Sequence, residues 1–249
     1  MERIYAIGDI HGHLDKLRQA HERIARDRRH TMDQDAPVVH LGDLVDRGPD
    51  SAGVISYLLA GPAQGGRWVT LRGNHDHMFA LFMLVPSGRD PALRTDLTWL
   101  DPRLGGATTL ASYGIADAKT RADADLHREA LAKVPPEHMH FLRGLPLYRQ
   151  IGPVICVHAG LRPGIPLQRQ NASDLMWIRA PFHDDRSDHG GLVVHGHTPV
   201  DRPSHHGNRL NLDTGAAYGR PLTAAVIEGR AVYELTDEGR VPVTPVDEA

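Results

Sequence analysis

The stretch that decides the fold is RIYAIGDIHG at residues 3–12, where an apolar run ends in a turn of glycine, aspartate and histidine. The same order recurs as VVHLGDLVDRG at residues 38–48 and as WVTLRGNHD at residues 68–76. A helical pattern follows each turn, over residues 14–26, 51–60 and up to residue 84. Three successive strand–turn–helix units predict an α/β fold.

Residues 86–140 break this rhythm with Pro, Gly and Asp between short segments, and they predict an insertion that caps the core as a lid. Further strands are expected at residues 154–157, 191–194, 224–227 and 231–234. The first two of these end in the histidine-containing turns HAG and HGHTP. The expected organisation is a single domain over residues 1–249, with the insertion at about 86–140.

The amino-acid composition argues against several classes of protein. The 249 residues are 41% hydrophobic and 24% charged, as in ordinary globular proteins. The net charge of −3 offers no basic excess, which argues against a nucleic-acid partner. There is no apolar run long enough for a membrane span and no secretory leader pattern, and the single cysteine fits a reducing compartment. We therefore expect no membrane partner and a cytoplasmic location; the oligomeric state has no sequence signal.

Five strand ends carry side chains that bind metals. Functional groups in α/β folds gather at the carboxyl ends of strands, and the candidates here are Asp9, His11, Asp43, Asn74, His158 and His197. Carboxylate, imidazole and amide together suit Mn²⁺, Fe²⁺ or Zn²⁺. Six protein ligands would saturate one ion, so two ions fit better than one.

The motifs at residues 8–12, 42–48 and 72–76 resemble the signature of the phosphoprotein phosphatase family of metallophosphoesterases. That family includes serine/threonine phosphatases and diadenosine tetraphosphate hydrolases. The resemblance continues through VHAG at residues 157–160 and LMWIR at residues 175–179. It implies an α/β/β/α sandwich of four layers, in which two central mixed β-sheets pack face to face.

The resemblance also implies a role for each matched residue. Asp9 and His11 would bind one metal ion, Asn74, His158 and His197 the other, and Asp43 would bridge the two. A hydroxide held between ions about 3.5 to 4 Å apart would then attack a phosphomonoester in line.

Two arginines, Arg47 and Arg179, would hold phosphate oxygens as planar forks. The resemblance assigns His75 as the general acid for the leaving alkoxide and Asp46 as the carboxylate that orients it.

Departures from the wider superfamily refine the expected substrate. The GHTP turn at residues 196–199 lacks the second histidine of a Gly-His-x-His ending, which favours the phosphoprotein phosphatase branch. The third motif ends in Asp76 where many eukaryotic members of that family have Glu, which implies a bacterial-type member. Residues 99–114 look like bacterial protein phosphatases, although Trp99 and Tyr113 could simply pack the lid.

The first interpretation is accordingly a phosphoserine/phosphothreonine protein phosphatase with two divalent ions, Mn²⁺ ahead of Fe or Zn. Its partner would be a phosphorylated protein or peptide, or a small phosphoester. A symmetrical dinucleoside tetraphosphate hydrolase is the alternative, and a catalytically inactive phosphopeptide-binding module is a remote one.

Three other features of the sequence could also indicate a functional role. Cys156 and Arg162 have the C-x5-R spacing of cysteine-dependent phosphatases, but Cys156 lies in an apolar run and is expected to be a buried strand residue. Asp213 begins an Asp-Thr-Gly turn that we expect near the site. His195 is either an alternative ligand or a neighbour of the site, and the sequence leaves its role and that of Asp213 open.

Overall fold

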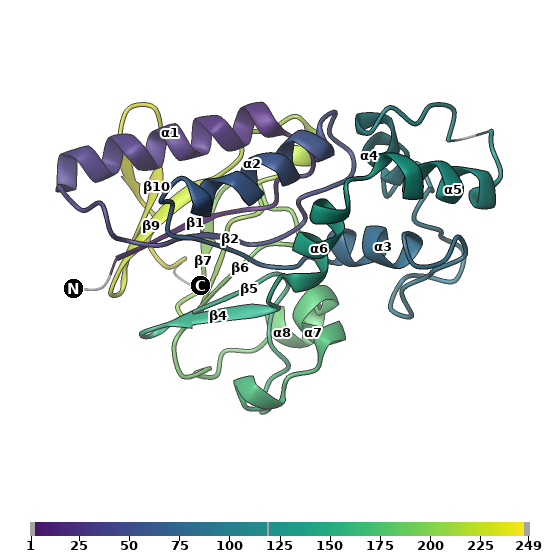
Figure 1. The fold of residues 1–249 in the computed structure, drawn as a ribbon. Helices are drawn as coiled ribbons and strands as arrows, with labels where there is room; N and C mark the ends of the chain where they lie inside the picture. The colour runs from purple at the N-terminus through teal and green to yellow at the C-terminus, as the bar shows by residue number, and fades with distance from the viewer. Residues whose placement is uncertain (1–2, 119, 247–249) are drawn as a thin grey trace.

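The computed structural model describes residues 3–118 and 120–246, and within them the strands form two mixed sheets (Figure 1). The first sheet contains β1 (Arg3–Ile7), β2 (Val38–His40), β3 (Trp68–Thr70), β9 (Ala224–Glu228), β10 (Ala231–Leu235) and β11 (Arg240–Pro242) in the order β11-β10-β9-β1-β2-β3. The second contains β4 (Tyr148–Ile151), β5 (Val154–Val157), β6 (Leu192–His195), β7 (Ser204–His205) and β8 (Arg209–Asn211) in the order β4-β5-β6-β8-β7. The strands that lead into the predicted site are parallel. In the first sheet these are β1, β2 and β3, and in the second they are β5 and β6.

Helices cover the outer faces of both sheets or lie to one side of them (Figure 1). They are α1 (Leu14–Thr31), α2 (Ser51–Ala63), α3 (Asn74–Phe82), α4 (Gly106–Ser112), α5 (Asp123–Lys133), α6 (Pro136–Gly144), α7 (Ala172–Trp177) and α8 (Ala180–His183), with short 3-10 turns η1 (Leu167–Arg169) and η2 (Ala216–Tyr218). Figure 1 shows α1 and α2 above the first sheet and α7 and α8 beyond the second, while α3 to α6 lie to one side of the sheets. The order helix, sheet, sheet, helix confirms the predicted sandwich of four layers.

Alternation along the strands builds the core. In β1, Ile4 and Ala6 face the second sheet and pack in one cluster with Cys156 and Val194. The intervening Tyr5 and Ile7 face the helices and join the cluster that contains Leu17. Because successive side chains of a strand point to opposite faces, one apolar strand serves both layers.

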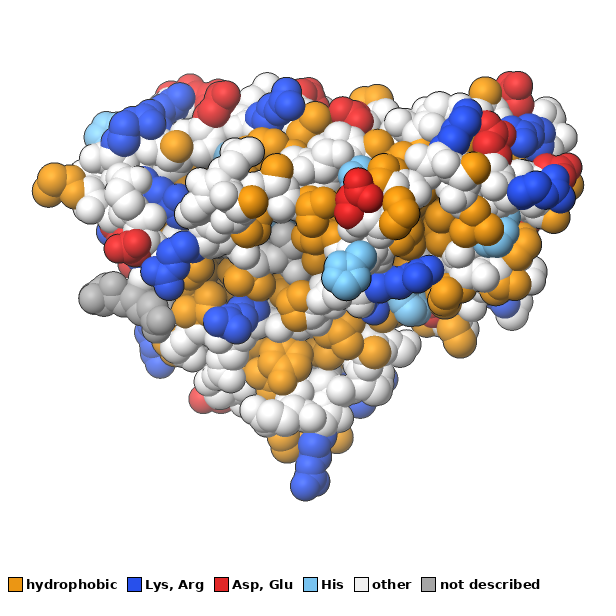
Figure 2. All heavy atoms as spheres, viewed as in Figure 1, with side chains coloured by type: hydrophobic (Ala, Val, Ile, Leu, Met, Phe, Trp, Pro, Cys, Tyr) orange, Lys and Arg blue, Asp and Glu red, His pale blue; other side chains and the backbone are white. Residues whose placement is uncertain are grey.

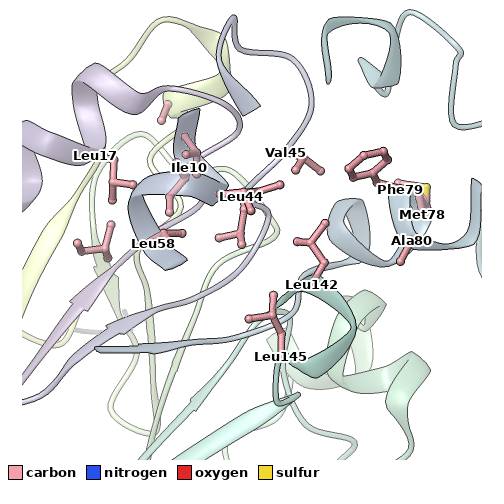
Figure 3. Close-up of a cluster of buried hydrophobic side chains, with 14 of the residues drawn as sticks. Ile10, Leu17, Leu44, Val45, Leu58, Met78, Phe79, Ala80, Leu142 and Leu145 are labelled. Carbon is pink, nitrogen blue, oxygen red and sulfur yellow. The ribbon is translucent and has the colours of Figure 1, made fainter. Parts of the chain in front are cut away.

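The insertion packs into this core instead of standing apart from it. Trp99, Leu110 and Leu126 are buried in the same cluster as Phe79 of α3 and Leu142 of α6, and Figure 3 shows α3 and α6 side chains continuing the row that starts at Leu17. The segment thus contributes α4, α5 and the first part of α6. Its action as a lid stays a prediction.

Local signals place most elements within a few residues. The Asp50 side chain accepts a hydrogen bond of 2.8 Å from the Gly53 amide, which caps α2 at the start the sequence indicates. The first helix continues to Thr31, five residues beyond its expected end, and Met32 closes it with a left-handed φ of 53°. Strands β4, β7, β8 and β11 are not among those expected from the sequence, and β7 has only two residues.

The visible surface fits the composition. Figure 2 shows acidic and basic side chains interspersed over α1 and the insertion, with apolar side chains gathered between them on this face. In the described part of the chain, no helix has the length and apolar character that a membrane crossing requires.

Candidate metal centre and catalytic site

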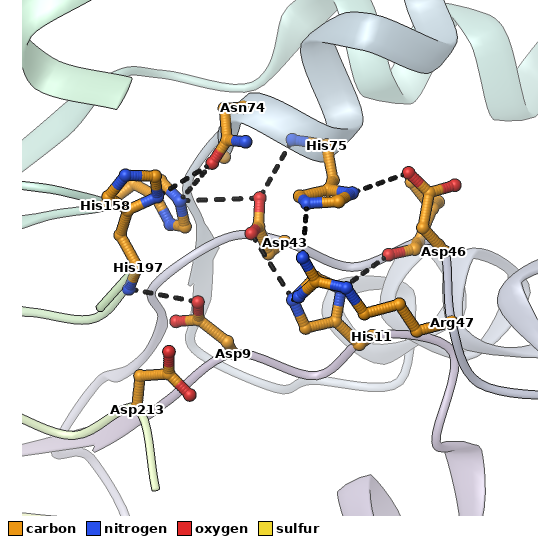
Figure 4. A network of polar contacts seen from close by, with 12 residues as sticks. Asp9, His11, Asp43, Asp46, Arg47, Asn74, His75, His158, His197 and Asp213 are labelled. Atoms are coloured by element: carbon orange, nitrogen blue, oxygen red, sulfur yellow. Dashed lines mark hydrogen bonds and ion pairs between the residues drawn. The ribbon is translucent and has the colours of Figure 1, made fainter. Parts of the chain in front are cut away.

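The turns after β1, β2, β3, β5 and β6 converge at one edge of the paired sheets (Figure 4). They bring together Asp9, His11, Asp43, Asp46, Arg47, Asn74, His75, His158 and His197. All of these except Arg47 are buried. Nine of the ten predicted site residues therefore share one cluster, although they come from five separate parts of the chain.

Around one oxygen of Asp43 lies a group that includes His11. The Nδ1 of His11 is 2.9 Å from the carbonyl oxygen of Val45, so Nδ1 carries the proton and Nε2 presents a lone pair. That Nε2 lies 3.5 Å from Oδ2 of Asp43, and Arg47 donates to it over 2.7 Å. Ligand atoms of His11, Asp43 and His75 lie within 4.8 Å of one another, close enough to surround one ion.

A second group lies on the other oxygen of Asp43. The Nδ1 of His158 is 3.0 Å from the Leu41 carbonyl oxygen, so its Nε2 also presents a lone pair. This Nε2 is 2.9 Å from Oδ1 of Asn74 and 3.4 Å from Oδ1 of Asp43. The Nδ1 of His197 lies 3.0 Å from the same amide oxygen. Acceptor atoms facing acceptor atoms in a buried site fit a cation among them.

Asp9 lies beside these groups without belonging to either of them. Its Oδ2 accepts a 3.0 Å hydrogen bond from the backbone amide of His197, while Oδ1 is buried and has no hydrogen-bond partner among the described residues. Burial and the nearby charges of Asp213 and Asp43 raise the pKa of Asp9 well above its ordinary value. Burial likewise raises the pKa of Asp213 to about 6, against a hydrogen bond from the Gly215 amide. Crowded carboxylates of this kind are relieved by bound cations, so the residues present fit divalent metal ions.

His75, a member of the first group, also forms a buried pair with Asp46. His75 donates from Nδ1 to Oδ2 of Asp46 over 2.7 Å, which turns its Nε2 toward Arg47 and the ring of His11. Two further side chains, Trp99 and Thr109, also donate to the Asp46 carboxylate. The ring of His75 is thus held in one tautomer and one orientation.

Backbone strain concentrates in this site. Among the described residues, seven that are not glycine have positive φ, and five of them belong to the cluster: His11, Asp43, Asp46, Arg47 and His197. Each left-handed residue of this type costs on the order of 1 to 3 kcal/mol. Such strain persists only where the surrounding fold fixes the chain, which is typical of functional sites.

Two glycines allow the backbone to approach the carboxylates. A Cβ on Gly73 would collide with Oδ1 of Asp43, and a Cβ on Gly196 would collide with Oδ1 of Asp9. Only glycine, which has no Cβ, lets the backbone come this close to the two carboxylates.

Asp76 is a supporting residue that sequence reasoning missed. It accepts hydrogen bonds of 2.8 Å from the amides of Gly73 and Leu44, which ties the turn after β3 to the turn after β2. An acid at the third position of a helix can reach back to the residue before the helix, and this spacing was the available signal.

Arg179 stands apart from the predicted set, at the exposed start of α8. Burial and, to a smaller extent, the positive charge of Arg179 lower the pKa of His158 and of His197, which places the arginine near the second group. It has no hydrogen bond or ion pair to the other described site residues.

Two other features of the sequence, the C-x5-R spacing and His195, lie outside the ligand groups. Cys156 is fully buried in β5, burial raises its pKa to about 12, and Arg162 pairs instead with Asp174. A thiol with that pKa is no nucleophile at neutral pH. His195 is buried against the ring of Phe182 and belongs to neither ligand group.

A sandwich of two mixed sheets with paired ligand groups at the strand ends defines a metallophosphoesterase. Residues 2–224 match the calcineurin-like phosphoesterase family. The chain belongs to that family, whose members hydrolyse phosphoric esters.

Named relatives divide between two activities. The chain is 29% identical to serine/threonine-protein phosphatase 1 of Salmonella typhimurium, over 90% of this chain and 92% of the relative. It is 27% identical to the asymmetrical bis(5'-nucleosyl)-tetraphosphatase PrpE of Anoxybacillus flavithermus, over 88% and 87%. A cold-active protein-tyrosine phosphatase shares the fold with a TM-score of 0.61 at 17% identity, covering 98% of this chain and 79% of that one. The PrpE relative is named for the asymmetrical reaction, whereas the alternative expected from the sequence was the symmetrical one.

Proposed function

We propose that this protein is a phosphatase that uses two divalent metal ions to hydrolyse phosphoserine and phosphothreonine in proteins. The observation that carries the proposal is the Asp43 carboxylate, whose two oxygens face two separate groups of buried lone pairs, 3.5 Å from His11 and 3.4 Å from His158. A carboxylate shared in this way is suited to space two ions.

The proposed ligands are Asp9, His11 and Asp43 for one ion, and Asp43, Asn74, His158 and His197 for the other. The mixture of carboxylate, imidazole and amide favours Mn²⁺, with Fe or Zn as alternatives. Bound ions would polarise phosphoryl oxygens and make water a stronger acid.

The remaining site residues would bind the charged phosphate and transfer a proton to the leaving group. Arg47, whose guanidinium already hydrogen-bonds to Nε2 of His11 and of His75, would turn its fork to phosphate oxygens. Arg179, which lies near the second ligand group, would bind phosphate oxygens as well. His75 would give a proton from Nε2 to the leaving oxygen while Asp46 holds Nδ1. A poor leaving group such as the serine alkoxide needs that proton most.

An asymmetrical dinucleoside tetraphosphatase is the second candidate, and one observation besides the relatives favours it. The ring of Tyr218 remains 62% exposed and lies 5.4 Å from the Arg47 guanidinium. An exposed aromatic ring beside a phosphate-binding arginine offers a stacking surface for a nucleobase.

The test begins with p-nitrophenyl phosphate turnover after EDTA treatment and readdition of Mn²⁺, with Cys156→Ser alongside. We expect loss with EDTA, recovery with Mn²⁺ and full activity in Cys156→Ser. Activity that ignores EDTA and disappears in Cys156→Ser would overturn the metal mechanism. Tight phosphopeptide binding without turnover in any metal would favour the binding-module alternative.

Parallel assays then decide the substrate. Release of phosphate from phosphoserine peptides, well above cleavage of diadenosine tetraphosphate, is the expected result. Efficient formation of ATP and AMP would favour the asymmetrical tetraphosphatase, and ADP alone would indicate the symmetrical reaction. In the asymmetrical case, Tyr218→Ala should reduce kcat/KM for the dinucleotide more than for the peptide.

A further inference from the structure

The Asp46 carboxylate is held by the insertion as well as by the catalytic loops. Trp99 donates from Nε1 to Oδ2 over 2.8 Å, and Thr109 donates from Oγ1 to Oδ1 over 2.7 Å. Both donors belong to the segment between residues 86 and 140, more than 50 positions away in the chain. The two contacts use both oxygens and leave Oδ2 shared between Trp99 and His75.

Each of these groups is shielded from water. Asp46 and Thr109 are completely buried and Trp99 is nearly so. A hydrogen bond to a charged group is stronger than one between neutral groups, and more so where water is excluded. The two donors therefore fix the position of the carboxylate much more firmly than solvent would.

Thr109 also contacts the backbone of the same residue. The Asp46 amide donates to Oγ1 of Thr109 over 2.8 Å, and Ser51 Oγ lies 3.0 Å from the same atom. Asp46 has a left-handed φ of 74°, a conformation that needs external support. One hydroxyl thus holds both the main chain and the side chain of Asp46.

Trp99 is itself fixed by rings of α3. Its indole stacks on Phe79 at 5.2 Å between centroids and contacts Phe82 at 4.8 Å. Because α3 begins at Asn74 and His75 and also carries Phe79 and Phe82, the same helix holds the acid and the rings that fix Trp99, the donor to its orienting carboxylate. The sequence left Trp99 open between packing the lid and a role in specificity, and this geometry gives it a different task.

We propose that Trp99 and Thr109 are positioning residues that align the His75–Asp46 pair for proton transfer to the leaving group, so that the insertion supports the chemical step as well as covering the site. The inference rests on the proposed role of His75. Neither residue touches the phosphoryl group, so their loss should affect substrates according to how much the leaving group needs a proton.

The experiment compares a phosphoserine peptide with p-nitrophenyl phosphate, whose leaving group departs readily without a proton. His75→Asn sets the scale, with a loss on the peptide of about 10²- to 10⁴-fold and a much smaller loss on the nitrophenyl ester. Thr109→Val and Trp99→Phe should each reduce kcat on the peptide by roughly 10- to 100-fold, the range typical of residues that support a reacting group from behind. Their losses on the nitrophenyl ester should be several-fold smaller, with KM little changed.

Matched variants separate positioning from folding. Thr109→Ser restores the hydroxyl and should recover most of the peptide activity. Thr108→Val changes the adjacent threonine, whose hydroxyl donates to the Gly105 carbonyl instead of to Asp46, and Trp68→Phe removes an indole from a separate aromatic cluster. Both should retain the wild-type ratio of peptide to nitrophenyl activity.

A spectroscopic readout is independent of turnover. In the metal-free protein, the proton on Nδ1 of His75 should give a downfield resonance that disappears in His75→Asn and shifts in Thr109→Val and Trp99→Phe. No shift, together with equal losses on both substrates, would mean that the two residues only stabilise the fold and would overturn the inference. Selective loss in His75→Asn but not in the two variants would also overturn it, while leaving the proposed function intact. Equal loss on both substrates in His75→Asn would instead refute the proposed role of His75.

Discussion

Gly196→Ala is the sharpest test of where Asp9 lies. A Cβ on Gly196 would overlap Oδ1 of Asp9, and its three nearest atoms all belong to that carboxylate. Overpacking of this kind costs about 1 to 3 kcal/mol, and each kcal/mol lowers Tm by about 2 to 4 °C in a domain near this size. The expected fall in Tm of the metal-free protein is therefore roughly 2 to 12 °C. Because relief requires Asp9 to move, activity should fall by about 10²-fold, the effect of a shift near 1 Å.

Calorimetric titration of the metal-free protein with Mn²⁺, beside thermal unfolding, measures both effects. Gly144→Ala is the matched control, because a Cβ there meets nothing within 4 Å, and it should leave Mn²⁺ binding unchanged. We expect Gly196→Ala to weaken or remove one of two binding events. Wild-type affinity and activity in Gly196→Ala would refute the reasoning, since the Asp9 carboxylate would then either lie elsewhere or take no part in binding.

Three further perturbations test other parts of the molecule. Asp43→Asn should reduce the bound metal, measured by elemental analysis, below two ions per chain, with a loss of activity larger than the roughly 10- to 100-fold typical of supporting residues. Asp213→Asn should stabilise the metal-free protein to urea at pH 8 but not at pH 4. The pKa of Asp213 rises from 3.8 to about 6 on folding, so the folded state binds an extra proton between these pH values. The stability of the wild-type protein therefore falls as the pH rises through that interval. An equal effect at both pH values would contradict this cause. Phe79→Ala should lower the free energy of unfolding by about 3 to 5 kcal/mol, since the ring is fully buried against Trp99, whereas Leu84→Ala, 63% exposed, should have little effect in the same denaturant titration.

Local pattern was enough to predict an α/β fold, because each strand of the site is short, apolar and followed by a turn that cannot continue it, whereas the sandwich of two sheets came from the resemblance to a known family. Strands β1, β2 and β5 lie where their apolar runs predict them, and the capping side chain of Asp50 places α2. What the pattern could not supply is pairing between distant segments. Strand β9 lies between β10 and β1 in the sheet although more than 200 residues separate it from β1 in the chain. The pairing of β9 with β1 depends on the burial of both faces of the sheet and not on residues near either strand in the chain.

The site residues likewise divide into those that the sequence predicts and those that only the tertiary structure shows. The residues of the five turns are brought together as their motifs predict, because parallel strands present their carboxyl ends at one edge. The residues that support them were missed for a physical reason. A threonine inside a short helix and a tryptophan in an irregular loop look like packing residues, and only the tertiary structure shows that both donate to Asp46.

Backbone conformation explains why such support is necessary. His11, Asp43, Asp46, Arg47 and His197 have a left-handed φ that their own side chains disfavour, so isolated segments would relax away from the catalytic arrangement. The compensating contacts come from far along the chain: Asp76 ties two turns together, Thr109 holds Asp46, and Asp9 accepts from the His197 amide. Because these contacts join strained residues, or the residues next to them, to other elements, the site forms only when both sheets and the insertion are in place. Substitutions at these contacts should therefore reduce the order of the site before they unfold the domain.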